Sequence, residues 1–476
     1  MSGAPPRYVD FGAYSRRVPP TIPAAVQQAT GRFLDKRAAR VAEVPEWEEL
    51  RQAASDIRLH TLTHLDTYLE QFEDRLTAAG GQVHWATDAA AARAVVLDIA
   101  RRAGASSAVK VKSMATEEIG LNHALEEAGI QAFETDLGEY IIQLAGVGPS
   151  HIIVPAVHMK KEEIAELFTE KLGVPAPADP VRLTALAREA LRERFLTAGV
   201  GISGANFLVA DTGTLVTVTN EGNGRMCTTL PDIHVGVVGI DKVVPDWESL
   251  TVLLRLLARS ATGQKLTTYT SFVTGPRRED GEGGPSEVHV VLLDNGRSRI
   301  LRDALARETL KCIRCGCCLN VCPVYKSVGG YAYGWFISGP IGAIFTPQML
   351  GMEAARELPY ASSLCGACVD VCPVKIPITK ILLRLRQRVA EGDETTPATA
   401  PLTTRLAARA GRWTLGTGWL YRLGLRFMAI VERPLVRDGW VKALPPPLDR
   451  WTRVRPIPAF RGGFRSWWRA RERTPR

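Results

Sequence analysis

Eight of the nine cysteines in this 476-residue chain are concentrated in one short stretch, and their spacing is that of a metal-binding loop. Clustered cysteines of this kind favour metal ligation over disulfide bonds. The first run reads C-x2-C-x2-C-x3-C-P, the spacing that bacterial ferredoxins use for a [4Fe-4S] cluster. It consists of Cys312, Cys315, Cys318, Cys322 and Pro323. Gly316 lets the backbone turn tightly enough for closely spaced thiolates to surround one cubane.

A second, shorter run follows, with Pro373 after its last cysteine and Ser362 where the first cysteine of a full motif would stand. In proteins with two clusters, the fourth cysteine of one run binds the other cluster. This rule assigns cluster 1 to Cys312, Cys315, Cys318 and Cys372. It assigns cluster 2 to Cys322, Cys365 and Cys368.

The incomplete second run leaves one iron of cluster 2 without a cysteine. Four arrangements remain open: a [3Fe-4S] cluster, an oxygen ligand from Ser362, a sulfur ligand from the additional Cys317, or an iron open to water or a substrate. A zinc ribbon is the competing interpretation, because paired C-x2-C units also bind zinc. Zinc ribbons have no need for the longer run, so we expect about seven or eight irons per chain.

The segments around the cysteines indicate how these loops are positioned. Residues 20–80 carry apolar residues mostly at three-to-four spacing, which predicts helices. From residue 82 onward, short apolar runs alternate with amphipathic stretches, which predicts an α/β domain with a parallel or mixed sheet covered by helices. The predicted parts are an N-terminal helical arm (1–80), the α/β domain (81–300), an α-rich ferredoxin-type dicluster domain (301–390), and a linker with a basic, Trp- and Arg-rich C-terminal extension (391–476).

Three segments have more specific patterns. Residues 206–244 are rich in β-branched residues around an acidic turn, and their strands should pair in an antiparallel or mixed sheet. TTYTSFVTG and EVHVVLLDNG flank a polar loop, so residues 269–294 are predicted to form a hairpin that closes the domain. Residues 323–364 are too rich in glycine and aromatic residues for a simple helix, and we expect them to cover the clusters.

The composition is that of a globular protein, with 46% hydrophobic and 23% charged residues, which excludes wholesale disorder, collagen and disulfide scaffolds. Residues 401–476 hold 17 Lys or Arg against 4 Asp or Glu. Because the whole chain has a net charge of +9, the first 400 residues carry about minus four. No secretory signal is visible at the N-terminus, and free thiols fit a reducing cytoplasm.

The C-terminal extension mixes tryptophan with arginine. The stretch WTLGTGWLYRLGLRFMAIV is only 19 residues long and contains Arg422 and Arg426, so a membrane span is not expected. Docking to an acidic partner subunit through Trp and Arg anchors is the favoured interpretation. Binding at the inner, anionic face of a membrane is the alternative, and nucleic-acid contact is not expected. Six of the ten tryptophans lie in this extension, namely Trp413, Trp419, Trp440, Trp451, Trp467 and Trp468.

Gly199, Gly201 and Gly204 match the dinucleotide fingerprint G-x-G-x-x-G, but the surrounding pattern contradicts it. A dinucleotide loop follows a strand and opens a helix, whereas here a helix is predicted before the glycines and a strand after them. The glycines are therefore expected to form a turn that leads into a central strand.

Two residue pairs carry weaker signals. Cys227 and His234 lie on either side of a proline, and without a third partner a structural role is favoured for each over a metal or nucleophile pair. Asn220 and Glu221, at the end of a predicted strand, are placed either to line a ligand crevice or to form a turn, with the turn favoured. No catalytic residue is predicted from these signals.

Longer stretches resemble a known family. KSMATEEIGLNHALEEAGI, ETDLGEYIIQLAGVGPSHIIVPAVH and GANFLVADTGTLVTVTNEGNGRMCTTLPDIHVGVVGIDKVVP are similar to the LUD (lactate utilisation) domain. With CIRCGCCLNVCPVY, SSLCGACVDVCPVKIPI and the basic extension behind them, the whole order resembles the lactate utilisation protein B family, whose members also have the serine at this position of the second run. The resemblance covers nearly the full chain.

This resemblance implies an α/β domain akin to the isomerase and CoA-transferase group, and an iron-sulfur subunit that passes electrons during oxidation of L-lactate to pyruvate. It implies two partner subunits, one cysteine-rich and one smaller with its own LUD domain. Three alternatives stay open. The LUD domain itself acts on lactate or another 2-hydroxy acid, the chain relays electrons for a different dehydrogenase, or it is an iron-sulfur scaffold without turnover.

Overall fold

The structure is a computed structural model that describes residues 6–279, 283–392, 397–445, 449–452, 455–459, 468–469 and 471. The chain divides into two compact units, Met1–Pro397 and Ala398–Arg476. The first unit contains the α/β part and the cysteine-rich part, and the second contains the basic extension. The further division of the first unit into an arm, an α/β domain and a dicluster domain stays a prediction.

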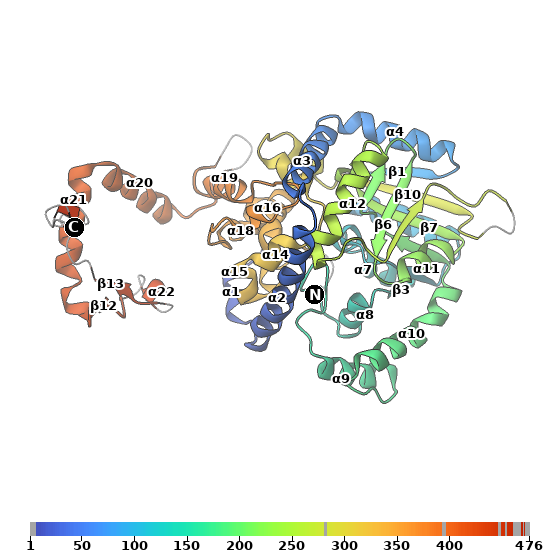
Figure 1. Cartoon of the computed structure of the whole chain (residues 1–476), viewed down its shortest axis with the longest axis horizontal. Helices are drawn as coiled ribbons and strands as arrows, with labels where there is room; N and C mark the ends of the chain where they lie inside the picture. The colour runs from blue at the N-terminus through green and yellow to red at the C-terminus, as the bar shows by residue number, and fades with distance from the viewer. Residues whose placement is uncertain are drawn as a thin grey trace. The chain divides into compact units, whose positions relative to one another are not determined.

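A six-stranded sheet forms the centre of the α/β part, in the order β1-β10-β7-β4-β2-β3. Figure 1 labels β1, β10, β7 and β3 of this sheet. All of its strands pair in parallel. Because parallel neighbours need crossover connections, helices link them. The predicted α/β class with a helix-covered sheet is confirmed. The strands are β1 (Gln82–Ala86), β2 (Ser107–Lys110), β3 (Gln131–Glu134), β4 (Val200–Ser203), β7 (Ile233–Gly239) and β10 (Glu287–Leu293).

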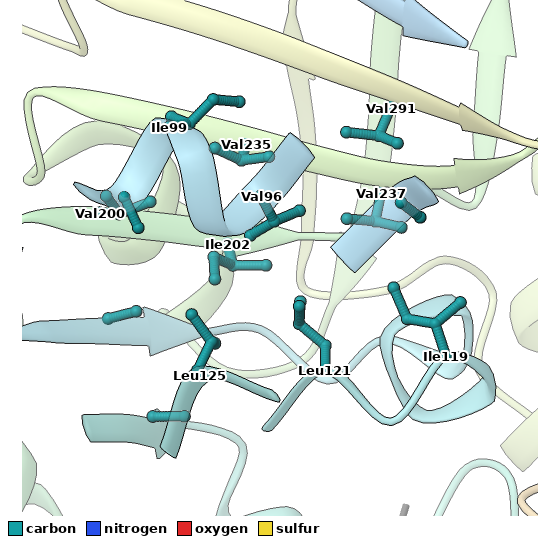
Figure 2. Packing of buried hydrophobic residues seen from close by; sticks show 14 of the residues in the cluster. Val96, Ile99, Ile119, Leu121, Leu125, Val200, Ile202, Val235, Val237 and Val291 are labelled. Carbon is teal, nitrogen blue, oxygen red and sulfur yellow. The ribbon is translucent and has the colours of Figure 1, made fainter. Parts of the chain in front are cut away.

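One face of this sheet packs against α5 (Ala89–Arg102) and α7 (Leu121–Glu127). Figure 2 shows Val96 and Ile99 of α5 beside Val235 of β7 in this core. The side chains of a strand alternate between the two faces, so the intervening residues of the same strands join separate cores on the other side.

The second face is covered by helices and by a smaller sheet. Its helices are α4 (Leu65–Ala78), α8 (Leu137–Leu144), α9 (Lys161–Leu172) and α10 (Pro180–Thr197). The smaller sheet has the order β8-β5-β6-β9 and is mixed, as predicted for residues 206–244, although β7 from that stretch joins the central sheet. Its strands are β5 (Phe207–Val209), β6 (Thr214–Thr219), β8 (Val243–Val244) and β9 (Tyr269–Val273).

The predicted hairpin over residues 269–294 is wrong. β9 pairs with β6 in the smaller sheet, whereas β10 inserts between β1 and β7 in the central sheet. Burial explains the difference: β10 is buried from Val288 to Leu293, while β9 is partly exposed along its length. A continuous apolar run of this kind is typical of a strand inside a parallel sheet.

The glycine run before β4 has two roles. Gly199 lies in the bend that precedes β4, as predicted, and α10 comes before it. Gly201 lies inside β4, contrary to the predicted turn. Glycine is needed there because a Cβ would stand 1.8 Å from the carbonyl oxygen of Cys227. Cys227 belongs to α11 (Asn223–Thr229), which packs directly on β4. The glycines therefore serve close packing of backbone against backbone.

Helices occupy the predicted stretch before the α/β part, and they contact both parts of the first unit. α4 packs against β1 and β8, whereas α2 packs against α14 and α15 of the cysteine-rich part. α2 and α3 also pack against α12 (Trp247–Thr262). The N-terminal helices are α1 (Phe11–Arg16), α2 (Thr21–Ala42) and α3 (Trp47–Thr63), followed by α4.

Short helices form the cysteine-rich part. The prediction that residues 323–364 contain no simple helix is wrong for α16, which is buried from Gly339 to Met349. A helix buried on all sides needs no polar face, so its sequence lacks the amphipathic period. The elements are η2 (Ala306–Lys311), α14 (Cys317–Val321), α15 (Pro323–Val328), η3 (Tyr331–Tyr333), α16 (Gly339–Leu350), α17 (Met352–Ala355), η4 (Leu358–Tyr360), α18 (Ala367–Asp370) and α19 (Ile378–Glu391).

The second unit has two main helices that bury little. Its large apolar side chains include Trp413, Trp419 and Phe427, which are 69%, 59% and 63% exposed. Trp467 lies outside the described residues. Within the described part of the chain, no helix combines the length and the apolar character that crossing a bilayer requires. The elements are α20 (Leu402–Gly416), α21 (Gly418–Val431), η5 (Arg433–Leu435), β11 (Val436–Arg437), β12 (Trp440–Val441), α22 (Asp449–Thr452) and β13 (Ile457–Pro458).

Candidate metal centre

The first cysteine loop runs from the end of η2 to the start of α15. Arg314 and Gly316 both have left-handed backbone, with φ of 60° and 71°. For a residue other than glycine, such as Arg314, left-handed backbone costs conformational energy and persists only where the surrounding structure requires it. At Gly316 a Cβ would also press on His151 of the α/β part, at 3.2 Å. The loop is therefore wound tightly and fitted against the neighbouring domain.

The second loop repeats this conformation. Leu364 and Gly366 have φ of 56° and 88°, and Gly366 begins α18 as Gly316 begins α14. α14 and α18 pack against each other, so the two cysteine runs are neighbours in space. Cys365 is exposed, whereas Cys368 is buried. The second loop therefore reaches the surface of the unit.

Backbone N–H groups point at three of the cysteine sulfurs. An N–H donor stabilises negative charge on a thiolate, and such bonds tune the potential of a cluster. Each donor comes from the turn that follows its cysteine, so the loop shape and the sulfur environment are set together. The bonds run from Arg314 N to Cys312 Sγ (3.4 Å), from Tyr325 N to Cys322 Sγ (3.5 Å) and from Ile376 N to Cys372 Sγ (3.4 Å).

The thiols influence one another across the two runs. Burial raises the pKa of Cys372, and the charge of Cys312 in the other run raises it further. Burial likewise raises the pKa of Cys368 to about 12, with added contributions from the charges of Cys322 and Cys365. Each run thus has an electrostatic neighbour in the other, as the crossed assignment requires. The assignment itself stays a prediction.

The donor set fits iron-sulfur clusters. All nine cysteines are free of disulfide bonds. Burial raises the pKa of Cys318 well above its usual range, and the charges of four other cysteines raise it further, so these thiols ionise together only when cations compensate them.

Cys317, one of the alternative ligands, lies at the start of α14 and is fully buried. Burial raises the pKa of its thiol to about 11, while the charge and a hydrogen bond of Arg37 lower it. The thiol therefore has a cationic neighbour, Arg37, which belongs to α2.

Basic side chains from other elements, Arg51 buried and Lys242 partly buried, hold the ends of the cysteine loops. Arg51 of α3 donates through Nε and Nη2 to the carbonyl oxygen of Cys372, at 3.0 and 2.9 Å. Lys242 of η1 (Ile240–Lys242) donates to the carbonyl oxygen of Cys312 at 2.9 Å and pairs with Asp241 at 2.7 Å. Sequence reasoning missed these residues, because no local pattern marks a basic side chain that reaches a distant carbonyl group.

A cavity of about 570 Å³ adjoins the first cysteine loop. Ile313 and Arg314 of that loop form part of its wall, and the rest comes from strands, helices and loops of the α/β part, including Lys112 and Asn223. Arg314 Nη1 and Asn223 Oδ1 are buried and have no hydrogen-bond partner among the residues that the structure describes. The guanidinium lies 4.3 Å from the ring centroid of Phe345, which fixes its plane.

Asn220 and Glu221 both line this cavity, so the crevice interpretation describes their position. Glu221 Oε2 accepts a hydrogen bond from the Leu137 backbone N–H at 3.2 Å. Glu221 is an exposed residue, but partial desolvation of its carboxyl group, and secondarily the charge of Asp136, raise the pKa of Glu221 to about 7. The carboxyl group therefore changes charge near neutral pH.

Cys227 and His234 lie in separate contacts. Cys227 is buried in α11 with its sulfur 3.4 Å from Thr135 Oγ1, and burial raises the pKa of the thiol to about 12. His234 Nε2 lies 2.7 Å from Ser203 Oγ. The two side chains therefore have different hydroxyl partners, and their structural roles stay a prediction.

Comparison with known proteins agrees with this geometry. Residues 69–293 match the LUD domain, and residues 308–376 match the 4Fe-4S dicluster domain. Lactate utilization protein B of Shouchella clausii is 45% identical over 451 residues, covering 94% of each chain. The protein of the same name from Oceanobacillus iheyensis is 44% identical, over 94% of this chain and 93% of its own. The chain belongs to the lactate utilization protein B family.

A solved structure of a DUF162 family protein from Deinococcus radiodurans also matches, at 14% identity and a TM-score of 0.27. It covers 48% of this chain and 98% of its own. The dicluster match and the names of the relatives confirm the resemblance seen in the sequence. The dicluster match indicates iron-sulfur clusters, and the names of the relatives refer to lactate utilization.

Exchanging single cysteines tests the crossed ligand assignment. We expect Cys372→Ala to remove cluster 1, although the residue lies in the second run, and Cys322→Ala to remove cluster 2. Each variant should lose about half of the roughly seven or eight irons, because a cubane with a missing thiolate is labile. Iron and sulfide content after anaerobic purification provides the measurement. Cys227→Ala, in α11 and outside both cysteine runs, serves as the control and should keep the full content.

Proposed function

We propose that this chain is the iron-sulfur electron-transfer subunit of a system that oxidises L-lactate to pyruvate. The proposal is carried by the two cysteine loops, which pack against each other beside the LUD domain and extend from the cavity wall at Arg314 to the surface at Cys365. When bound, a pair of [4Fe-4S] clusters supplies single-electron chemistry. The residues of the chain exclude water from most of the thiols and leave one loop open to a partner.

The supporting observations come from both loops. Cys315, Cys322, Cys368 and Cys372 are each at most 7% exposed. Burial of this extent, with N–H donors at the sulfurs, is how a protein sets the potential of a cluster. Cys365 of the second loop is exposed, so an electron donor or acceptor can approach that loop from solvent. The names of the relatives indicate lactate as the substrate of the system.

Reduction by lactate should depend on the partner subunits. Anaerobic protein should bleach in visible absorption when dithionite is added, because the clusters accept electrons directly. With L-lactate alone we expect no bleaching. When the cysteine-rich subunit and the smaller LUD subunit are added together with L-lactate, we expect the absorption to bleach. A deletion strain should lose growth on L-lactate. Bleaching by lactate without partners would contradict the relay assignment.

We further propose that the second unit is the docking element for an acidic partner subunit. Its two main helices expose Trp413, Trp419 and Phe427, and 17 basic residues stand against 4 acidic ones in residues 401–476. Aromatic and arginine side chains are the usual anchors of protein interfaces. The high positive charge fits a partner with an acidic surface.

Replacing these aromatic anchors tests the docking. A Trp413→Ala, Trp419→Ala, Phe427→Ala triple variant should lose co-purification of the partner subunits, with affinity reduced at least about tenfold, while dithionite bleaching stays intact. Trp85→Ala, an exposed tryptophan of β1, is the matched control. Sedimentation with anionic phospholipid vesicles tests the membrane alternative. Partner binding that survives the triple variant, together with loss of vesicle binding, would assign the unit to a lipid surface.

A second candidate function is favoured by the cavity. The alternative is that the LUD domain itself binds the 2-hydroxy acid, and the cavity wall is shared between that domain and the first cysteine loop. Arg314 Nη1, which has no hydrogen-bond partner within the described part of the chain, provides a donor for a carboxylate, while Asn223 Oδ1 provides an acceptor for a hydroxyl group. The cavity volume of about 570 Å³ lies within the usual range of small-molecule binding sites.

Binding of L-lactate by the purified chain measures this second candidate. Arg314→Gln should weaken binding by about tenfold or more, since a charge-assisted hydrogen bond is lost. Affinity should fall as the pH rises through about 7, because Glu221 ionises there and repels the anionic ligand. Glu221→Gln should flatten that pH dependence. Calorimetry from pH 6 to 8, with iron content checked for each variant, gives the measurement, and no heat of binding would remove the candidate.

A further inference from the structure

The second cysteine loop repeats the first residue by residue at its turns. The third and fifth residues of the first loop, Arg314 and Gly316, have left-handed backbone, and so do the third and fifth of the second, Leu364 and Gly366. Only a few non-glycine residues of the described chain have positive φ, and two of them occupy this one position. Such a conformation persists only where the surrounding structure requires it. The two loops are therefore folded to the same shape.

The repeat includes the hydrogen bond at the first residue. In the first loop the Arg314 N–H donates to Cys312 Sγ at 3.4 Å, and in the second the Leu364 N–H donates to Ser362 Oγ at 3.1 Å. The shorter distance reflects the smaller size of oxygen. The hydroxyl oxygen of Ser362 thus occupies, in its own loop, the position that the sulfur of Cys312 occupies in the other.

Ser362 is also held in place. Its backbone N–H donates to the Tyr360 carbonyl oxygen at 2.8 Å, and its own carbonyl oxygen accepts from Arg386 Nη2 at 3.1 Å. Arg386 Nε in addition donates to the Pro359 carbonyl oxygen at 2.9 Å. Two residues of α19 and η4 therefore fix the segment that carries the hydroxyl group. The neighbouring Ser363 is exposed and corresponds to Ile313, not to a cysteine, in the first loop.

We propose that Ser362 is the fourth ligand of cluster 2, through its hydroxyl oxygen. The hydroxyl proton is released to solvent when the iron–oxygen bond forms, so the serine binds as an alkoxide, and no electron is transferred. This inference rests on the proposed assignment of Cys322, Cys365 and Cys368 to cluster 2. An oxygen ligand is harder than a thiolate, so it favours ferric iron and lowers the potential relative to a fourth cysteine.

Substitution of the serine tests the ligand. Ser362→Ala should lose about one iron per chain, and the oxidised protein should gain the low-temperature EPR signal of a [3Fe-4S] cluster. Ser362→Cys should keep the full iron content and raise the potential of cluster 2 in a redox titration followed by EPR. Ser363→Ala is the matched control and should behave as the unsubstituted protein does.

Two results would overturn the inference. One is Ser362→Ala protein whose iron content and oxidised EPR spectrum equal those of the unsubstituted protein. The other, which also covers an unstable alanine variant, is Ser362→Cys protein with an unchanged cluster 2 potential. Failure of the underlying cluster assignment is recognised separately: in that case the unsubstituted protein lacks a second cluster, or Cys365→Ala leaves it intact.

Discussion

The cysteine loops depend on hydrogen bonds from basic side chains that belong to other parts of the fold. Arg51 of α3 holds the carbonyl oxygen of Cys372, and Lys242 of η1 holds that of Cys312. A buried charge is costly unless it is paired and hydrogen-bonded, so these contacts persist only with both sides in place. Lys242 in turn pairs with Asp241, which Arg297 also contacts at 2.6 Å. The loops and the α/β part are therefore one mechanical unit.

The same network continues into the α/β part. Arg297 makes a second buried contact, to Glu118 at 2.7 Å, so two acids compensate the one guanidinium. Arg58 of α3 donates to carbonyl oxygens of Asp241, Val243 and Leu310, and thereby joins the N-terminal helices to η2 directly before Cys312. Movement of any one of these elements would expose an unpaired charge to a dry environment.

The sequence was informative where a local pattern carries a physical requirement. The cysteine spacing predicted the loops, and strand-helix alternation predicted the parallel sheet. It failed at Tyr269–Val273 and β10, because adjacency in sequence suggested pairing while burial decided which sheet each strand joined. It failed at α16, whose complete burial removes the helical period. Nothing local could indicate Arg51 or Lys242, since their partners lie some 70 to 320 residues away.

The place of β10 in the central sheet has a consequence for how the protein is made. It is the last strand of the α/β part, yet it lies between β1 and β7. A growing chain can therefore not close this sheet until residue 293 has left the ribosome, and until then β1 has no partner strand. The cysteine runs come directly after β10 in the chain, so every strand of the central sheet leaves the ribosome before the metal ligands do.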